Sequence, residues 1–265
     1  MWDPAKYLDF ADLRGRPFFD LTARIGATAP RRVVDLGCGP GNLTAALAQR
    51  WPQAALEASD NSPEMVAAAR KLGIDAELID VRQWSPKPDT DVVVSNAVLQ
   101  WVPEHRELLE RWVRELPRGA WIAIQVPGNF DAPSHVLARE LAASAGWADK
   151  LGSVGLRDDD AVDAPPQYAE RLARLGCQVD AWETTYTQRL QGDNAVLEWI
   201  TGTALRPVKA ALDAQDWQRF RSELAAMLDR AYPPRGDGTT WFEFRRIFVV
   251  ARTPQRRRRS RVGSR

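Results

Sequence analysis

Five short apolar runs mark the first half of the chain, and helical patterns stand between them. Each run has the length and composition of a strand that is buried on both faces of a sheet. The predicted strands cover residues 33–36, 54–59, 76–79, 91–95 and 121–126. Helices are predicted over residues 17–28, 42–50, 63–72 and 104–115. Strands and helices that alternate at this spacing predict a doubly wound α/β fold with a mostly parallel sheet.

The pattern changes after Val126. Residues 129–175 and 194–231 are largely helical, and we expect them to contribute the helices of a lid. Residues 178–190 are rich in β-formers, and residues 241–251 form a final, strongly β segment. The second half therefore adds two strands and a helical insert to the sheet.

Charge is unevenly distributed along the chain. The formal net charge is +1, but residues 256–265 carry six arginines and no acid. Without them, 30 basic residues face 35 acidic ones, a net charge of −5, so the body offers no basic face for nucleic acid. We expect one domain over residues 1–254 and a disordered basic tail over 255–265, which is too charged to pack.

Cys38 and Cys177 are the two cysteines, too few for a disulfide framework or a zinc cluster, so no metal is expected. The first residues lack the charged and apolar regions of a signal peptide, and no stretch of roughly 18 apolar residues would span a membrane. We therefore expect a monomeric cytoplasmic protein that acts away from membranes.

A glycine-rich turn follows the first predicted strand. Residues 35–41 read Asp-Leu-Gly-Cys-Gly-Pro-Gly, and ligands of open α/β sheets bind at this edge. The G-x-G-x-G spacing differs from the dinucleotide-binding G-x-G-x-x-G, because Asn42 stands at the third glycine position. No Gly-Lys-Ser/Thr follows, which excludes a P-loop. The turn therefore suits an adenosine ligand without a pyrophosphate.

Asp60 stands after the second predicted strand, about 20 residues beyond the glycines. An acid at this position accepts hydrogen bonds from both ribose hydroxyls. The alternative is a helix N-cap, since aspartate is also favoured at that position.

These segments resemble the motifs of class I S-adenosylmethionine-dependent methyltransferases. The matching segments are residues 33–41, 59–65, 80–81 and 95–97. The resemblance implies a seven-stranded, Rossmann-like sheet and S-adenosylmethionine as cofactor. It also implies that Asp80 binds the adenine amine, that the Val81 backbone contacts the ring, and that Asp35 lies near the methionine portion. The residues implied or inferred to bind the cofactor are Asp35, Gly37, Gly39, Asn42, Asp60, Asn61, Asp80, Val81 and Asn96.

Residues 2–8, 96–105 and 241–248 resemble one subfamily of these enzymes, the trans-aconitate methyltransferases. This resemblance implies that a small tricarboxylate receives a methyl group as an ester. A carboxylate has a pKa near 4, so it is ionised at neutral pH and needs no general base. Of the two histidines, we place His105 near the mouth of the cofactor site and His135 on a helix surface.

A trianionic acceptor requires cationic and hydrogen-bonding partners. Arg246 falls on the apolar face of the last strand with Phe244 and Phe248, so it needs a buried acid or a ligand anion. The candidates for substrate binding are Arg14, Trp101, Gln125, Trp241 and Arg246. The candidates for a catalytic role are Gln125, Arg246 and His105, in a reaction that rests mainly on proximity.

Other functions remain open at this point. A carboxyl methyltransferase that acts on another small acid or on a malonyl thioester uses the same chemistry, although a carrier protein would favour a basic docking face. A module that binds S-adenosylmethionine without transfer is a second alternative, because no obligatory base marks the active enzyme. Asn42 argues against an oxidoreductase, and Ser95-Asn96-Ala97-Val98 differs from the Asn/Asp-Pro-Pro-Tyr/Phe motif of nucleic-acid methyltransferases.

Overall fold

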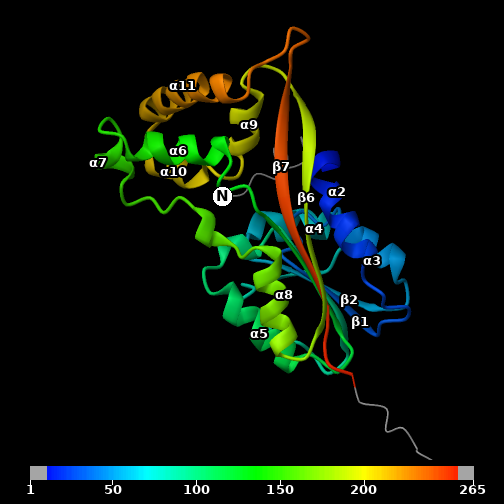
Figure 1. The fold of residues 1–265 in the computed structure, drawn as a ribbon. Helices are drawn as coiled ribbons and strands as arrows, with labels where there is room; N and C mark the ends of the chain where they lie inside the picture. Colours follow the sequence, from blue (N-terminus) through cyan, green and yellow to red (C-terminus); the bar gives the residue numbers. More distant parts are fainter. Residues whose placement is uncertain (1–10, 256–265) are drawn as a thin grey trace, which may run out of the picture.

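The computed structural model describes residues 11–255, except for the side chains of residues 11–14 and 159. Within this range the strands form a seven-stranded sheet in the order β3-β2-β1-β4-β5-β7-β6 (Figure 1). The strands are β1 (Arg32–Leu36), β2 (Ala55–Asp60), β3 (Ala76–Leu78), β4 (Thr90–Asn96), β5 (Trp121–Pro127), β6 (Gln178–Gln191) and β7 (Thr239–Arg252). β7 runs antiparallel to both of its neighbours, whereas the other neighbouring strands are parallel. The predicted doubly wound, mostly parallel sheet is confirmed.

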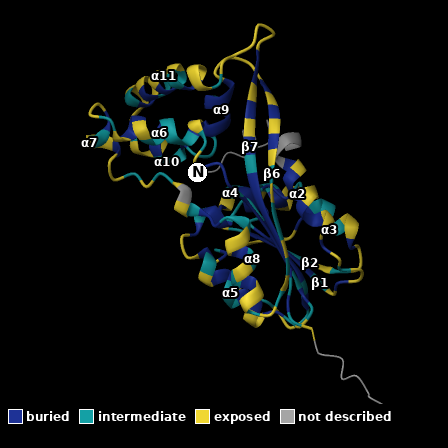
Figure 2. Ribbon diagram, in the orientation of Figure 1, coloured by how far each residue is buried: buried dark blue, intermediate teal, exposed yellow. Residues whose placement is uncertain are grey.

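Helices cover both faces of this sheet (Figure 1). The helices that pack on the sheet are α2 (Ala11–Ala23), α3 (Thr44–Arg50), α4 (Pro63–Lys71), α5 (His105–Glu115) and α8 (Pro165–Arg174). Val33 of β1 packs in one core with residues of α2 and α3, while its neighbour Val34 packs in another with residues of α5 and α8. Successive residues of a strand point to opposite faces, so the apolar run of β1 is buried on both. Figure 2 shows the resulting buried centre between exposed outer helix faces.

A second group of helices stands beside the upper part of β6 and β7 (Figure 1). We call this group the cap; it consists of α6 (Pro133–Ala143), α7 (Ala148–Leu151), α9 (Ala195–Thr201), α10 (Arg206–Ala211) and α11 (Ala214–Ala231). The cap has its own core, which includes Trp147, Trp199, Phe220 and Phe242. The lid predicted over 129–175 is thus partly wrong, because α8 packs on β6 and α5 and belongs to the sheet.

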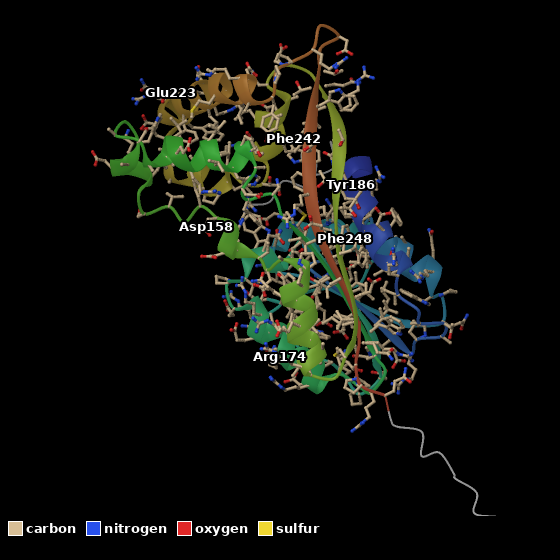
Figure 3. The ribbon with its side chains drawn as sticks, in the orientation of Figure 1. Asp158, Arg174, Tyr186, Glu223, Phe242 and Phe248 are labelled. Atoms are coloured by element: carbon tan, nitrogen blue, oxygen red, sulfur yellow. The ribbon has the colours of Figure 1, made fainter. Side chains whose placement is uncertain are left out.

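β7 connects the two cores. It pairs with β6 over Thr239–Arg252 but with β5 only over Arg246–Arg252, so its first half extends beyond the central sheet. Figure 3 shows Phe242 in this extended half and Phe248 within the sheet. Phe242 packs in the cap core, and Phe248 packs in the core of the sheet.

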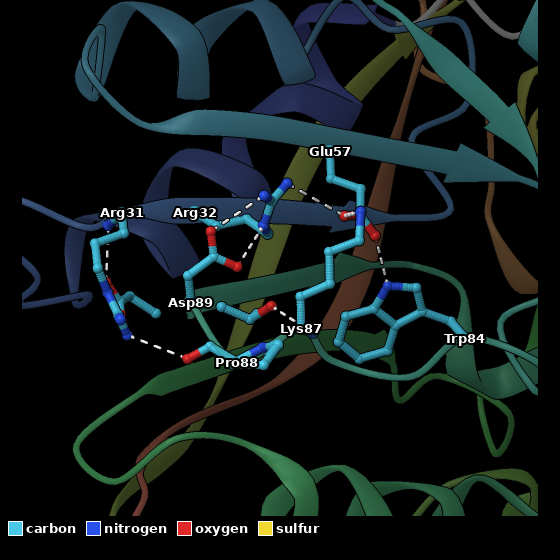
Figure 4. A network of polar contacts seen from close by, with 9 residues as sticks. Arg31, Arg32, Glu57, Trp84, Lys87, Pro88 and Asp89 are labelled. Atoms are coloured by element: carbon cyan, nitrogen blue, oxygen red, sulfur yellow. Dashed lines mark hydrogen bonds and ion pairs between the residues drawn. The ribbon is translucent and has the colours of Figure 1, made fainter.

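Charged contacts fasten the segment between β3 and β4 (Figure 4). Glu57 of β2 accepts hydrogen bonds from Trp84 Nε1 at 2.9 Å and from Lys87 Nζ at 2.7 Å. Arg32 lies between Glu57, at 3.6 Å, and Asp89, at 2.9 Å. These contacts hold the segment near the amino-terminal ends of β1 and β4, away from the edge where ligands bind.

The described helices of residues 11–255 include none that is both long and apolar enough to cross a membrane. The tail predicted to be disordered, except for Gln255, lies outside the described residues, as do residues 2–8.

Candidate active site

The glycine turn after β1 is packed on one side and open on the other. Gly37 and Gly39 have φ angles of +77° and +56°, which residues with a side chain rarely adopt. A Cβ on Gly37 would lie 2.2 Å from Val98 Cγ2, so a side chain does not fit there. At Gly39, no atom of the described residues lies within 4 Å of the corresponding position. The turn therefore allows a ligand to approach its backbone at Gly39.

A cavity of about 270 Å³ adjoins this turn at the carboxyl ends of β1, β2 and β4, and we call it the first cavity. The predicted cofactor residues in its wall are Gly37, Gly39, Asp60, Asn61, Asp80, Val81 and Asn96. Trp101 also lines it, and Arg206 reaches it from the cap. Residues from four separate segments of the sheet thus converge where the sequence motifs place an adenosine ligand.

Asp60 lies in the wall of the first cavity with its carboxylate held by two backbone amides. The Gly39 N–H donates to Oδ2 and the Ser62 N–H donates to Oδ1, both at 2.9 Å. Ser62 is the N-cap of α4 and accepts from the Met65 N–H, so the N-cap alternative for Asp60 is wrong. Burial raises the pKa of Asp60, and the backbone amides partly offset this rise. Each carboxylate oxygen has a further lone pair for a ligand hydroxyl.

Asp80 lies in the same wall but already has a partner. Arg82 Nε donates to Oδ1 at 2.9 Å and Arg82 Nη2 donates to Oδ2 at 2.6 Å. This ion pair lowers the pKa of Asp80, so the carboxylate is charged at neutral pH. An adenine amine at this position would share Asp80 with Arg82.

The structure does not bring Asp35 and Asn42 to the wall of the first cavity. Asp35 is buried beneath the turn, where Thr44 Oγ1 donates to Oδ2 at 2.7 Å. Burial raises the pKa of Asp35 to about 6. The contact with Thr44 ties the end of β1 to the first residue of α3, which supports the shape of the turn.

A second cavity, of about 80 Å³, meets the first at Ala97 and Trp101. It lies between the carboxyl end of β5, the middle of β7 and the cap. Its wall includes Gln100, Asn129, Phe130, His135, Arg157, Trp199, Phe244 and Arg246. Two cavities that share a wall at the end of β4 can hold a group donor and a group acceptor side by side.

Ala97 stands at the junction in a left-handed conformation, with φ of +59°. Such a conformation is uncommon for a residue other than glycine and occurs where the surroundings fix it. The Ala97 N–H donates to the Gln125 carbonyl at 2.8 Å, and the Ala97 carbonyl accepts from Gln100 Nε2 at 2.7 Å. The bend turns the chain away from β4 and leaves space between the two cavities.

Arg157 and Arg246 give the second cavity a positive wall. The Arg157 guanidinium lies 3.4 Å from the centre of the Trp101 ring, and burial lowers its pKa to about 10. Arg246 is buried, lies over the Phe244 ring at 4.1 Å, and donates from Nη1 to Gln125 Oε1 at 3.4 Å. Both guanidinium groups therefore carry charge in an apolar surrounding, which favours an anionic ligand.

Buried amide atoms point to a ligand in the same place. Both side-chain polar atoms of Asn129, together with Gln100 Oε1 and Gln125 Nε2, lack a hydrogen-bond partner among the described residues. Buried polar atoms are rarely unpaired in native proteins. A polar acceptor molecule in the second cavity would supply the partners for Asn129 and Gln100, whose side chains line it.

Several predicted site residues lie elsewhere. His105 is fully buried, with Nδ1 at 2.9 Å from the Val102 carbonyl and Nε2 at 2.8 Å from the Tyr168 hydroxyl. Both ring nitrogens are engaged, and His105 lines neither cavity, so the structure does not support a catalytic role. Trp241 is exposed on the opposite face of β7 from Phe242 and does not line the second cavity. The side chain of Arg14 lies outside the described ones.

Sequence reasoning overlooked several residues of the second cavity, including Gln100, Asn129, His135 and Arg157. His135, expected on a helix surface, lies in the first turn of α6 and lines the cavity. Arg157 follows α7 in an irregular segment, where no periodic pattern marks it. Its neighbours Asp158, Asp159 and Asp160 instead suggest a solvent-exposed charged turn, so the sequence carried no signal for its role.

Comparison with known proteins agrees with this geometry. A family described as "Methyltransferase domain" matches residues 10–180. In solved structures, the YcgJ protein from Bacillus subtilis shares the fold with a TM-score of 0.59 and 14% identity, over 92% of this chain and 99% of that one. The glycine turn, the acid after β2 and the reversed β7 together define a class I methyltransferase.

Relatives of high sequence identity identify the family within this class of methyltransferases. The trans-aconitate 2-methyltransferase of Rhodococcus jostii (strain RHA1) is 68% identical over 95% of this chain and 99% of its own length. That of Mycobacterium tuberculosis (strain ATCC 25177 / H37Ra) is 56% identical over 97% of this chain and 99% of its own. The chain belongs to the trans-aconitate 2-methyltransferase family.

Proposed function

We propose that this protein transfers the methyl group of S-adenosylmethionine to one carboxylate of trans-aconitate. The observation that carries the proposal is the junction at Ala97 and Trp101, where a cavity with adenosine-binding motifs meets one lined by Arg157 and Arg246. The relatives are named for trans-aconitate, and a positive, enclosed second cavity suits a small tricarboxylate.

The first cavity fits S-adenosylmethionine. Asp60 would accept from the ribose hydroxyls, and the open side of Gly39 admits the ligand close to the backbone. Asn96 Oδ1 is buried and lacks a partner among the described residues, so it would accept from the ammonium group of the methionine portion. When bound, S-adenosylmethionine supplies a methyl group on a positively charged sulfur.

The second cavity would orient the acceptor. Arg157 and Arg246 would each bind a carboxylate, and Asn129 would donate and accept a further hydrogen bond. The remaining carboxylate would face the junction, where one of its oxygens attacks the methyl carbon as the carbon–sulfur bond breaks. The products are a methyl ester and S-adenosylhomocysteine, and no proton is transferred. Phe130, Trp199 and Phe244 exclude water from the reacting groups.

This chemistry assigns alignment to the protein and requires no general base. A carboxylate is already ionised at neutral pH, so the nucleophile needs no activation. Gln125 supports the reaction indirectly, because its side chain accepts from Arg246 and its carbonyl accepts from Ala97. We regard Gln125 and Arg246 as positioning and binding groups, respectively.

The protein is expected to act as a monomer in the cytoplasm. Cys38 and Cys177 are both free thiols, which suits a reducing compartment. Light scattering of the purified protein tests the monomer, and a mass near twice 29.7 kDa would contradict it.

An acceptor screen with methyl-labelled S-adenosylmethionine tests the proposed reaction. The panel contains trans-aconitate, cis-aconitate, isocitrate and a malonyl thioester. We expect the highest kcat/KM with trans-aconitate and a base-labile methyl ester as product. No transfer to trans-aconitate, or a higher kcat/KM with the malonyl thioester, would overturn the assignment.

A further inference from the structure

His135 lines the second cavity but has no part in the methyl transfer described above. Its ring meets Phe130 edge-on, with 5.6 Å between ring centres, and Nδ1 lies 3.1 Å from Ser134 Oγ. Tyr232, the residue that follows α11, holds the backbone beside it, because the Ser134 N–H donates to the Tyr232 hydroxyl at 3.1 Å. An ionisable ring is therefore held in one place on the wall of a cavity for an anion.

The charges around His135 are positive. Arg157 lies in the wall of the same cavity, Arg139 lies one turn further along α6, and Arg246 faces the cavity from β7. Arg139 also donates to the carbonyls of Phe130 and Arg157, which brings its guanidinium close to this wall. Burial, followed by the charges of Arg157 and Arg139, lowers the pKa of His135 to about 4, so the ring is neutral at pH 7 without a ligand.

A tricarboxylate changes this balance. It brings three negative charges into a cavity of about 80 Å³, where Arg157 and Arg246 supply two positive ones. A carboxylate within about 4–6 Å of an imidazole favours its protonated form and typically raises its pKa by about 1–3. His135 lines this cavity together with Arg157 and Arg246, so a carboxylate bound between the two arginines would lie near its ring.

We propose that, near pH 6 and below, His135 takes up a proton when the tricarboxylate binds, so that Arg157, Arg246 and His135 then match its three charges. The inference rests on the proposed function, because it assumes that the acceptor occupies the second cavity. The proton comes from solvent and adds to the unprotonated ring nitrogen, and no bond to carbon changes.

Methylation then reverses the uptake. The product ester has two charges instead of three, which Arg157 and Arg246 already match. His135 therefore returns its proton to solvent, and the site holds the product less tightly than the acceptor. His135 acts in this way as a specificity residue that distinguishes a tricarboxylate from its monoester.

Nuclear magnetic resonance of the imidazole C–H groups provides a direct test, because the chain has only two histidines. His135 is titrated in the intact protein with saturating S-adenosylhomocysteine, first alone and then with saturating trans-aconitate. We expect the pKa of His135 to rise by at least one with trans-aconitate and by less with its monomethyl ester. His105, whose two nitrogens are engaged outside the cavities, serves as the internal reference and should not respond. A pKa of His135 that is the same with and without trans-aconitate would overturn the inference.

Calorimetry separates this inference from the proposed function. At pH 6, binding of trans-aconitate in buffers of different ionisation enthalpy should show uptake of about 0.5 proton per molecule if the bound pKa is near 6. The difference between the wild type and His135→Gln removes the contribution of the ligand's own ionisation. Binding with equal proton uptake in the two proteins would refute the role of His135 and leave the function intact. Absence of any binding of trans-aconitate to the wild type would refute the proposed function itself.

Discussion

Replacement of Arg157 by methionine should separate acceptor binding from stability. Methionine keeps an unbranched apolar side chain against the Trp101 ring, which lies 3.4 Å from the guanidinium, and removes the charge. Of the two arginines that line the second cavity, Arg157 is the better residue to replace, because no carboxylate of the described residues forms an ion pair with it. Its loss should therefore act on the ligand rather than on a protein partner.

The surroundings of the Arg157 side chain determine how much kcat/KM and the free energy of unfolding should change. A hydrogen bond to a charged group contributes about 1.5–3 kcal/mol, so kcat/KM for trans-aconitate should fall by about 10- to 150-fold. The buried guanidinium itself costs stability, because a pKa lowered from 12.5 to about 10 corresponds to a penalty of about 3 kcal/mol for the charged form. Part of this penalty disappears in the variant, so its free energy of unfolding should equal or exceed that of the wild type.

Steady-state kinetics with both substrates and denaturant unfolding measure the two effects. Arg219→Met is the matched control, because Arg219 also lies over a tryptophan, Trp147 at 4.5 Å, but on the exposed surface of α11. The control should keep full activity with trans-aconitate, and Arg157→Met should bind S-adenosylhomocysteine normally. Unchanged kcat/KM in Arg157→Met would refute the assignment of the second cavity to the acceptor. A loss of stability of about 2 kcal/mol or more would refute the argument from burial.

Four further outcomes are expected. Asp60→Ala should weaken S-adenosylmethionine binding about 30-fold or more by calorimetry, since it removes charged hydrogen bonds to the ribose; unchanged affinity would exclude that role. Gly39→Ala should weaken the same binding and lower the melting temperature by only a few degrees, because its Cβ would meet open space and the positive φ costs about 1–2 kcal/mol; normal binding would place the ligand elsewhere. Arg246→Ala should raise the KM for trans-aconitate about 30-fold without changing cofactor affinity, and an unaltered KM would argue against its contact with the acceptor. Glu57→Ala should lower the free energy of unfolding by about 1–3 kcal/mol, since it leaves Trp84 Nε1 without its acceptor, whereas Arg32 keeps its two hydrogen bonds to Asp89. Glu77→Ala on β3, whose side chain is exposed, is its control, and equal stability of the two would contradict the network.

The sequence predicted the strands of the sheet closely because their signal is local. A buried parallel strand is a short apolar run between turns, and β1, β4 and β5 begin and end within one residue of the prediction. Strand alternation also placed Arg246 on the buried face of β7, where the structure has it. The same alternation puts Trp241 on the opposite face, so its exposure was readable from the sequence.

The acceptor site was harder to predict because it forms between distant segments. Arg157 and Asn129 belong to irregular segments, and only the packing of the cap brings them beside β7. His105 was predicted in the site but lies outside it. Its position after the β4 motif suggested the mouth of the cofactor site. A hydrogen bond to Tyr168, 63 positions later, instead holds it beneath α8. The pattern of hydrophobic and polar positions in a single sequence does not reveal contacts between residues that are so far apart in the chain.

The continuous strand β7 also bears on how such an enzyme acquires new substrates. The cap enters the chain as two insertions, one between β5 and α8 and one between β6 and β7, and neither interrupts the cofactor-binding half. Phe242 and Phe244 anchor the inserted helices, while Arg246 and Phe248, further along the strand, belong to the acceptor wall and the sheet. Helices α6, α7 and α9–α11 can therefore be exchanged as a unit between related enzymes if β7 is kept. Exchange of residues 128–164 and 192–238, which leaves α8 and β6 in place, would transplant an acceptor preference onto the same sheet, and of the residues that line the methyl-donor cavity only Arg206 would change with the cap.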